Sequence, residues 1–156
     1  MPADKSPVDD PPKSSPDKLS IVVFSGSFER VHYALVMAAA AVASNTPVTL
    51  FFTMGAARAL ERPAADGTPA WHRLPLAEGS GSAAAMDAGF RATGIAGFDD
   101  LLEACVALGV TIMVCEMGLK ALGIPADGLR TDLPIAAGGV VTFLADASRH
   151  GGMLFI

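Results

Sequence analysis

The two cysteines of the chain, Cys105 and Cys115, carry its best nucleophiles and stand in different settings. Cys115 directly follows the apolar run 110–114 and precedes Glu116 and Met117. The sequence therefore predicts its thiol at the point where a buried strand gives way to a helix. Unpaired backbone N–H groups and the helix dipole stabilise a thiolate in the first turn of a helix. Such a thiolate can attack a sulfur donor and hold the transferred atom as a persulfide.

The same residues also fit structural roles. A small apolar residue at the end of a buried strand would explain Cys115 without chemistry, and an inward-pointing Glu116 would oppose ionisation of the thiol by like charge. Cys105 falls on the apolar stripe of its own predicted helix, which favours core packing. His32, one turn into the first predicted helix, could help to deprotonate Cys115 or could lie on the surface. Cys105 and His32 are therefore auxiliary candidates.

Three predicted strand ends are expected to share one edge of the sheet with Cys115. Ligands of open α/β sheets bind at the carboxyl ends of the strands, so the turns there should shape a common pocket. The residues expected in this pocket are Ser25, Gly26, Ser27, Thr53, Met54, Glu116 and Met117. The turn at 25–27 offers hydroxyl and N–H groups at a helix start, which suits an anion or ordinary helix capping. It matches neither the dinucleotide-binding nor the P-loop motif.

The composition restricts the class of protein. A chain of 156 residues with 51% hydrophobic and 17% charged residues suits one domain whose parallel sheet is covered on both faces. A net charge of -5 and the lack of any Lys/Arg run argue against a nucleic-acid partner, which needs a clustered basic face. Two cysteines and three scattered histidines are too few for a disulfide framework or a metal site, so no metal is expected.

Residues 1–18 mix proline, serine and both signs of charge, which is typical of a disordered tail. They lack the apolar segment of a secretory signal, so a cytoplasmic protein is expected. Between Arg30 and Arg58 no residue is charged, and a hydropathy scan could read this stretch as a membrane span. Pro47 interrupts it, and its two halves differ in composition. We therefore expect a helix followed by a buried strand and no membrane insertion.

The elements that must position these side chains follow from the spacing of apolar residues. Apolar runs that end at small-residue turns predict strands over 19–24, 48–53, 110–114 and 153–156. Helical spacing predicts helices over 28–43, 98–108 and 139–149, with short helices after residues 53 and 115. Strands that alternate with helices predict a three-layer, doubly wound α/β domain with a mainly parallel sheet over 19–156.

A long loop at about 62–82 interrupts this alternation and holds the only tryptophan, Trp71. It is rich in proline, glycine and serine. A loop of this length in a compact domain is usually functional or mobile. We expect either a surface insertion anchored by Trp71 or a lid or subunit contact.

Several stretches of the chain form a recognisable set. The first is FSGSFER at 24–30, followed by an alanine-rich helix and VTLFFT at 48–53. The second runs from 98 to 110 and continues with Cys115-Glu116-Met117, and the last are 138–144 and 153–156. Together they resemble the DsrE/DsrF-like family, and in particular a larger DsrE-like subgroup often labelled "peroxiredoxin family". The resemblance covers roughly 19–156 and weakens across 62–97.

This resemblance implies a flavodoxin-like fold, assembly into homo-oligomers and, in several branches, sulfur relay on a cysteine near the end of a central strand. Cys115 matches that cysteine, and Cys105 matches a helix cysteine of some members. Gly118 departs from the pattern, because members often carry Ser or Thr there. The implied partners are donor or acceptor protein thiols, with no organic cofactor. The high hydrophobic content also favours burial between subunits.

The leading hypothesis is thus a sulfur carrier, or sulfurtransferase-like protein, that relays sulfane sulfur as a persulfide on Cys115. An alternative is a non-catalytic oligomeric module that binds a small anion or nucleotide at the strand-end rim. A flavodoxin-like redox protein is a third possibility, although the chain lacks a convincing phosphate loop.

Overall fold

Five short strands form one sheet in the computed structural model, which describes residues 15–156. They are β1 (Leu19–Val23), β2 (Val48–Phe52), β3 (Thr111–Cys115), β4 (Ile135–Gly138) and β5 (Gly152–Phe155). Their order is β4-β3-β2-β1-β5, and every neighbouring pair is parallel. The order reverses at β1, so the sheet is doubly wound as predicted. Most of the predicted tail lies outside the described residues.

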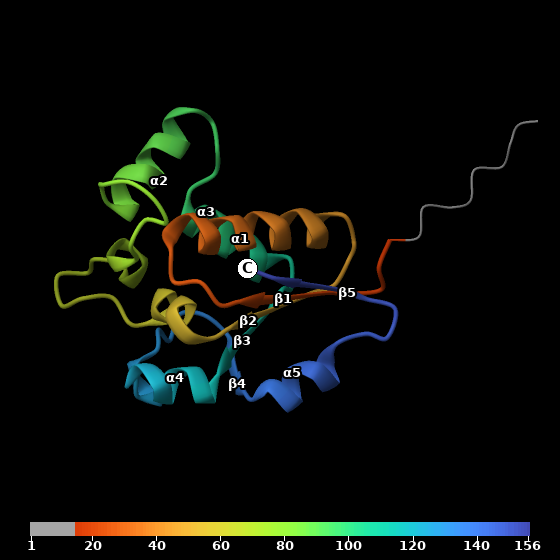
Figure 1. The fold of residues 1–156 in the computed structure, drawn as a ribbon. Coiled ribbons are helices and arrows are strands. Elements are labelled where there is room, and N and C mark those ends of the chain that lie inside the picture. Colours follow the sequence, from red (N-terminus) through yellow and green to blue (C-terminus); the bar gives the residue numbers. More distant parts are fainter. Residues whose placement is uncertain (1–14) are drawn as a thin grey trace, which may run out of the picture.

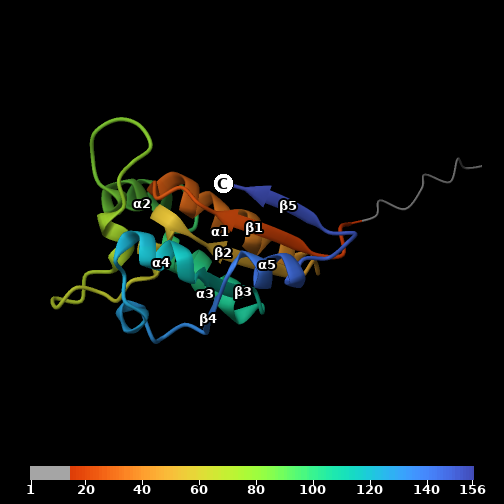
Figure 2. The same cartoon turned by 60° about the horizontal axis from the view of Figure 1, so that its bottom comes forward.

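Helices cover both faces of this sheet and complete three layers (Figure 1). On one side lie α1 (Phe28–Ala43), α2 (Ala83–Ala92) and α3 (Phe98–Ala107), with α1 packed against α3. On the other side lie α4 (Glu116–Leu122) and α5 (Val140–Asp146), which stand in front of the sheet in the turned view (Figure 2). Three 3-10 helices occupy the connections: η1 (Met54–Leu60), η2 (Ala70–Arg73) and η3 (Ala126–Gly128).

Alternation along the strands sorts their side chains into two hydrophobic clusters. The main cluster contains Ile21, Leu50 and Val114 and is covered by α1 and α3. A smaller cluster on the opposite face consists of Phe51, Met113, Cys115 and Phe143, with Val22 packed against it. Successive side chains of a strand point to opposite faces. Because helices cover both faces of the sheet, β2 is buried along its whole length. The register thus fixes the face on which each strand-end side chain lies.

Two elements were absent from the predicted set, β4 and α2. β4 reads Ile-Ala-Ala-Gly, and small residues carry little strand signal. The last helix ends at Asp146 and not at Arg149. β3 runs through Cys115, one residue further than predicted. Among the described residues, no helix combines the length and the apolar character needed to cross a membrane.

The loop at 62–82 is anchored by Trp71, which is 3% exposed and stacks on Phe98 with ring centroids 5.0 Å apart. Its indole N–H donates to the carboxylate of Asp99 at 3.2 Å. Further along the loop, the carbonyl of Pro75 accepts a hydrogen bond from the first backbone N–H of α1, that of Phe28, at 2.8 Å. These contacts hold the loop down through its tryptophan and place it over the start of α1.

Candidate functional site

Cys115 is the last residue of β3, and its side chain is 0% exposed. It pairs with Gly138 of the neighbouring strand β4. Strand alternation turns its thiol toward the smaller cluster, where its neighbours are Phe51, Met113 and Phe143. The candidate nucleophile therefore stands at the carboxyl end of a central strand, but it is sealed among apolar side chains.

The prediction that this thiol lies in the first turn of a helix is wrong by one residue. Cys115 has extended backbone angles (φ -77, ψ 118) and is the N-cap of α4, with no hydrogen bond from its side chain to the helix. Because it keeps its place in the β3–β4 ladder, its side chain follows the strand and not the helix. The N–H groups that would stabilise a thiolate start immediately after it, at Glu116 and Met117.

One short helix closes the space in front of Cys115. Of the seven residues of α5, Phe143 is the buried one, and its ring stacks on Phe51 with centroids 4.6 Å apart and planes 14° apart. The other end of α5 is tied down by Asp146, whose carboxylate accepts from Lys18 Nζ and from Thr49 Oγ1, each at 2.6 Å. α5 thus covers the thiol with one aromatic ring, and the contact of Asp146 with Lys18 and Thr49 is a polar latch that holds the helix in place.

The latch at Asp146 is electrostatically favourable. Burial alone would raise the pKa of this carboxyl group, but hydrogen bonds from Lys18 and Thr49 and the charge of Lys18 outweigh it and lower the pKa below its usual value. Asp146 is therefore ionised at neutral pH and holds α5 against the start of β1 and against β2.

The three predicted turns meet at the carboxyl edge of the sheet, but backbone fills the space between them. A Cβ atom on Gly26 would lie 3.0 Å from the carbonyl carbon of Gly55, so the turns after β1 and β2 are in direct contact. A Cβ atom on Gly118 would lie 2.7 Å from the backbone nitrogen of Met54 and 2.8 Å from Thr53 Oγ1. The pocket expected there is thus occupied. The same contact explains why Ser or Thr does not fit at 118.

The serine turn is similarly occupied. Ser25 Oγ and Ser27 Oγ lie 3.1 Å apart, and Ser25 Oγ also accepts from the N–H of Ser27 at 3.3 Å. The N–H of Phe28, at the helix start that suited either an anion or ordinary capping, donates to the carbonyl of Pro75. By contrast, Glu116 is exposed and Met117 is 62% exposed, so both face solvent at the start of α4.

The structure brings neither auxiliary candidate to Cys115. Cys105 lies in the main cluster, donates through Sγ to the carbonyl of Leu35 at 3.7 Å, and has its pKa raised to about 11 by burial. His32 Nε2 donates to the carbonyl of Ala96 at 2.9 Å and packs beside Phe90. Both belong to the side of the sheet covered by α1 and α3, so they have structural roles and stand away from the Cys115 thiol.

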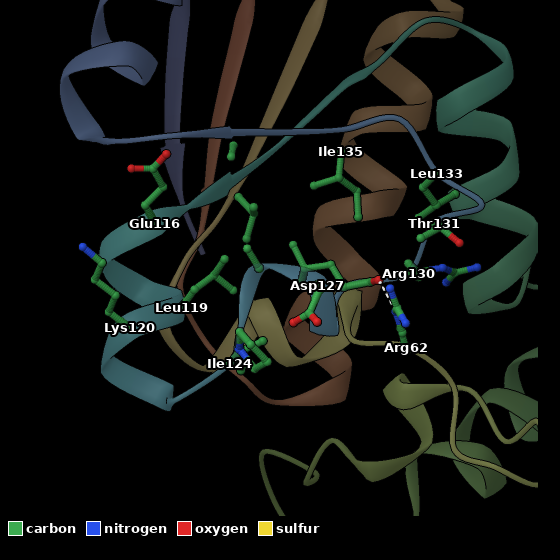
Figure 3. A pocket seen from close by; sticks show the side chains of 15 residues that line it. Arg62, Glu116, Leu119, Lys120, Ile124, Asp127, Arg130, Thr131, Leu133 and Ile135 are labelled. Atoms are coloured by element: carbon green, nitrogen blue, oxygen red, sulfur yellow. Dashed lines mark hydrogen bonds between the residues drawn. The ribbon is translucent and has the colours of Figure 1, made fainter.

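A cavity of about 590 Å³ lies between α4, the end of β3 and the segment 124–137 that leads into β4 (Figure 3). Its apolar floor includes Val114, Leu119 and Ile135. Arg62 stands at the rim with its Nε donating to the carbonyl of Leu129 at 3.1 Å, and Asp127 projects from another wall. Of the residues expected in a strand-end pocket, Glu116 lines this cavity, whereas the rest of its lining was not predicted because β4 and the turns before it carry no clear motif. It lies beside the backbone of Cys115, on the side away from its thiol.

Comparison with known proteins gives the family. The family model described as "DsrE/DsrF-like family" matches residues 17–150. The chain belongs to the DsrE/DsrF-like family. This family is generally linked to sulfur relay. No curated protein matches the chain in sequence.

Among solved structures, the chain is similar to the YchN protein from E. coli. The TM-score is 0.53 and the sequence identity is 16%, over 89% of this chain and 99% of that protein. At this identity the likeness establishes the fold alone. Membership of the DsrE/DsrF-like family and the wholly parallel sheet agree with the architecture predicted from the sequence.

Proposed function

We propose that this DsrE/DsrF-like protein carries sulfane sulfur as a persulfide on Cys115. The observation that supports the proposal is the position of this thiol at the carboxyl end of β3, in a chain whose family is linked to sulfur relay. Ligands and reactive groups of open α/β sheets gather at this edge. Burial raises the pKa of Cys105 to about 11, so its thiol is protonated and a poor nucleophile at neutral pH.

The transfer itself is a thiol–disulfide type of exchange. The Cys115 thiolate attacks the outer sulfur of a donor persulfide, R–S–SH. A new S–S bond forms at Cys115, the S–S bond of the donor breaks, and the donor leaves as the thiolate R–S⁻. One S–S bond replaces another, so the step needs neither an oxidant nor an organic cofactor. Delivery is the reverse step, in which an acceptor thiolate attacks the outer sulfur and Cys115 departs as a thiolate.

The start of α4 suits the product of this step. The N–H groups of Glu116 and Met117 directly follow Cys115, and both residues face solvent. Once the thiol turns toward them, these donors and the positive helix end stabilise a persulfide anion. The partners in this proposal are donor and acceptor protein thiols, and both exchanges require that α5 move away from Cys115.

Apolar side chains on the surface support assembly into a homo-oligomer. Phe24 and Phe155 are 44% and 70% exposed and lie against each other with ring centroids 5.3 Å apart. Met153, two residues before Phe155 on β5, is 50% exposed. Large apolar side chains exposed next to one another are often covered by another chain. We propose that a second copy of the protein covers these side chains.

The experiment that tests the sulfur-carrier proposal is intact mass spectrometry after incubation with inorganic polysulfide. We expect a mass increase of about 32 Da, one sulfur atom, on the wild-type protein and on Cys105→Ala. Cys115→Ala should show no increase. Persistent failure of the wild-type protein to gain mass, with other persulfide donors tried as well, would refute the proposal.

Complete burial of Cys115 favours one alternative, a binding module without covalent chemistry. The cavity beside β4 offers that module an apolar floor and the guanidinium of Arg62 for a small anion or nucleotide. This alternative predicts that Cys115→Ser leaves ligand binding and assembly intact. It also predicts that Arg62→Ala weakens the thermal shift produced by phosphate or ATP.

A further inference from the structure

We propose that α5 is a hinged cover that opens over Cys115 while the rest of the sheet stays folded. The inference rests on the proposed function, because it states how that site would be regulated. When the cover is closed, water and bulky reagents are kept from the thiol. When it is open, the thiol and the start of α4 are exposed together at the carboxyl edge of the sheet.

The inner contact of the cover is small. Phe143 is 2% exposed and packs in the cluster of Phe51, Met113 and Cys115, which is separate from the main core. The rest of α5 is exposed or partly exposed, including Val141 at 82%. Withdrawal of one ring therefore uncovers the thiol without disturbing the cluster beneath α1 and α3. Elements with few buried contacts are the ones that open locally in native proteins.

The chain on either side of α5 can accommodate such a movement. Gly139, directly before the helix, has no atom within 4 Å of the position that its Cβ would take, so nothing packed there resists rotation. After the helix, the backbone is fixed again at Gly151 and Gly152. The N–H of Gly152 donates to the Lys18 carbonyl at 2.8 Å, and a Cβ on Gly151 would lie 2.6 Å from the same oxygen. The N–H of Asp17 also donates to the His150 carbonyl at 3.3 Å, so the movable segment runs from Gly139 to Arg149.

A polar latch holds the far end of this segment. Asp146 accepts from Lys18 Nζ and Thr49 Oγ1, and Lys18 Nζ also donates to the backbone carbonyl of Asp146 at 3.0 Å. The two charged side chains are 19% and 31% exposed, so water can replace their contact when it breaks. Phe143 and Asp146 together determine how often the cover opens.

Alkylation of the two cysteines in one sample tests the cover. The native protein is treated with N-ethylmaleimide, and the labelling rates of Cys115 and Cys105 are read from their peptides by mass spectrometry. Cys105 reports global unfolding, because it lies in the main core. In the wild-type protein, Cys115 should react faster than Cys105, since it needs only local opening.

Three variants make the test specific. Phe143→Ala should raise the Cys115 rate by about ten-fold or more, and Asp146→Asn by a few-fold, and Cys105 should still react more slowly than Cys115 in both variants. Val141→Ala is the matched control on the outer side of α5 and should change neither rate. If Phe143→Ala does not fold, Asp146→Asn and Thr49→Val still test the latch. Equal labelling rates of both cysteines in every folded variant would overturn the proposal.

The result is separable from the sulfur chemistry. Labelling by N-ethylmaleimide requires no sulfur donor. If Cys115 is labelled rapidly but the protein gains no sulfur from polysulfide, the sulfur carrier is rejected and the cover is kept. Persulfide formation with labelling rates that do not respond to Phe143 or Asp146 would reject the cover and keep the sulfur carrier.

Discussion

Phe143 of α5 stacks on Phe51 of β2 with their ring centroids 4.6 Å apart, and this contact closes the cluster that encloses Cys115. The residue proposed to carry sulfur and the residue that seals it therefore belong to one small group of side chains. A persulfide formed in such a group is shielded from water and oxidants while α5 is closed. The cost is that each transfer must first displace an aromatic ring.

Removal of that ring should also lower stability. Phe143→Ala leaves a cavity next to Phe51, and substitutions of this kind typically cost about 3–5 kcal/mol of unfolding free energy. Val141→Ala is a matched control on the same helix, because Val141 is 82% exposed and its truncation should cost about 0.5 kcal/mol or less. Urea unfolding followed by circular dichroism measures both. Equal midpoints for the two variants would show that Phe143 does not seal the cluster.

The buried thiol of Cys105 should make stability fall at alkaline pH. Its pKa is raised by burial from 9.0 to about 11, so between these values the unfolded chain loses a proton that the folded protein retains. The stabilisation is complete below about pH 9 and declines by up to about 1.4 kcal/mol per pH unit as the pH rises toward 11. Cys105→Ala should lack this part of the decline. Parallel pH profiles of the two proteins in urea unfolding would contradict the assignment.

The latch at Asp146 should weaken in acid. Its pKa is lowered from 3.8 in the folded protein, so its contribution is present above that value and is lost as the pH falls through the folded pKa. At neutral pH, Asp146→Asn should be less stable than the wild type by about 1 kcal/mol, the magnitude of a partly exposed ion pair. The difference should shrink below pH 3.8. Thermal unfolding at several pH values measures it, and a difference that is independent of pH would exclude an ionic latch.

The exposed rings of Phe24 and Phe155 should mark the contact between subunits. Phe155→Asp places a charge in the proposed interface and should shift the protein toward monomer in sedimentation velocity. Thr131→Asp, on the exposed turn before β4, adds the same charge away from these rings and serves as control. A wild-type protein that sediments as a monomer at high concentration would contradict the proposed assembly.

The sequence predicted the positions of β1, β2, β3 and β5, because each is an apolar run that ends at small residues. It also predicted Cys115 at the end of a central strand. It missed β4 and α2, whose alanines and glycines give weak periodicity. Burial of the thiol by Phe143, 28 positions along the chain, is a tertiary contact that no local pattern encodes.

The sequence also contained no sign that backbone would fill the pocket expected between the three strand-end turns. Contacts between Gly26 and Gly55, and between Gly118 and Thr53, depend on how closely the turns approach in space. From the sequence, His32 could either point at the strand-end rim near Cys115 or lie on the surface. In fact α1 carries it to the opposite face, where the carbonyl of Ala96 holds its ring. The register of the strands and the winding of the sheet decide which turns touch and on which face a side chain such as His32 lies.

The most direct test of the sulfur-carrier proposal follows the peptide that contains Cys115 through loading and delivery. The protein is loaded with polysulfide, freed of donor, and then given an acceptor thiol, and the peptide mass is measured at each stage. We predict a gain of about 32 Da on Cys115 that disappears when the acceptor is added, while Cys105 stays unmodified. An unmodified Cys115 peptide at every stage, in the wild type and in Phe143→Ala alike, would contradict the account.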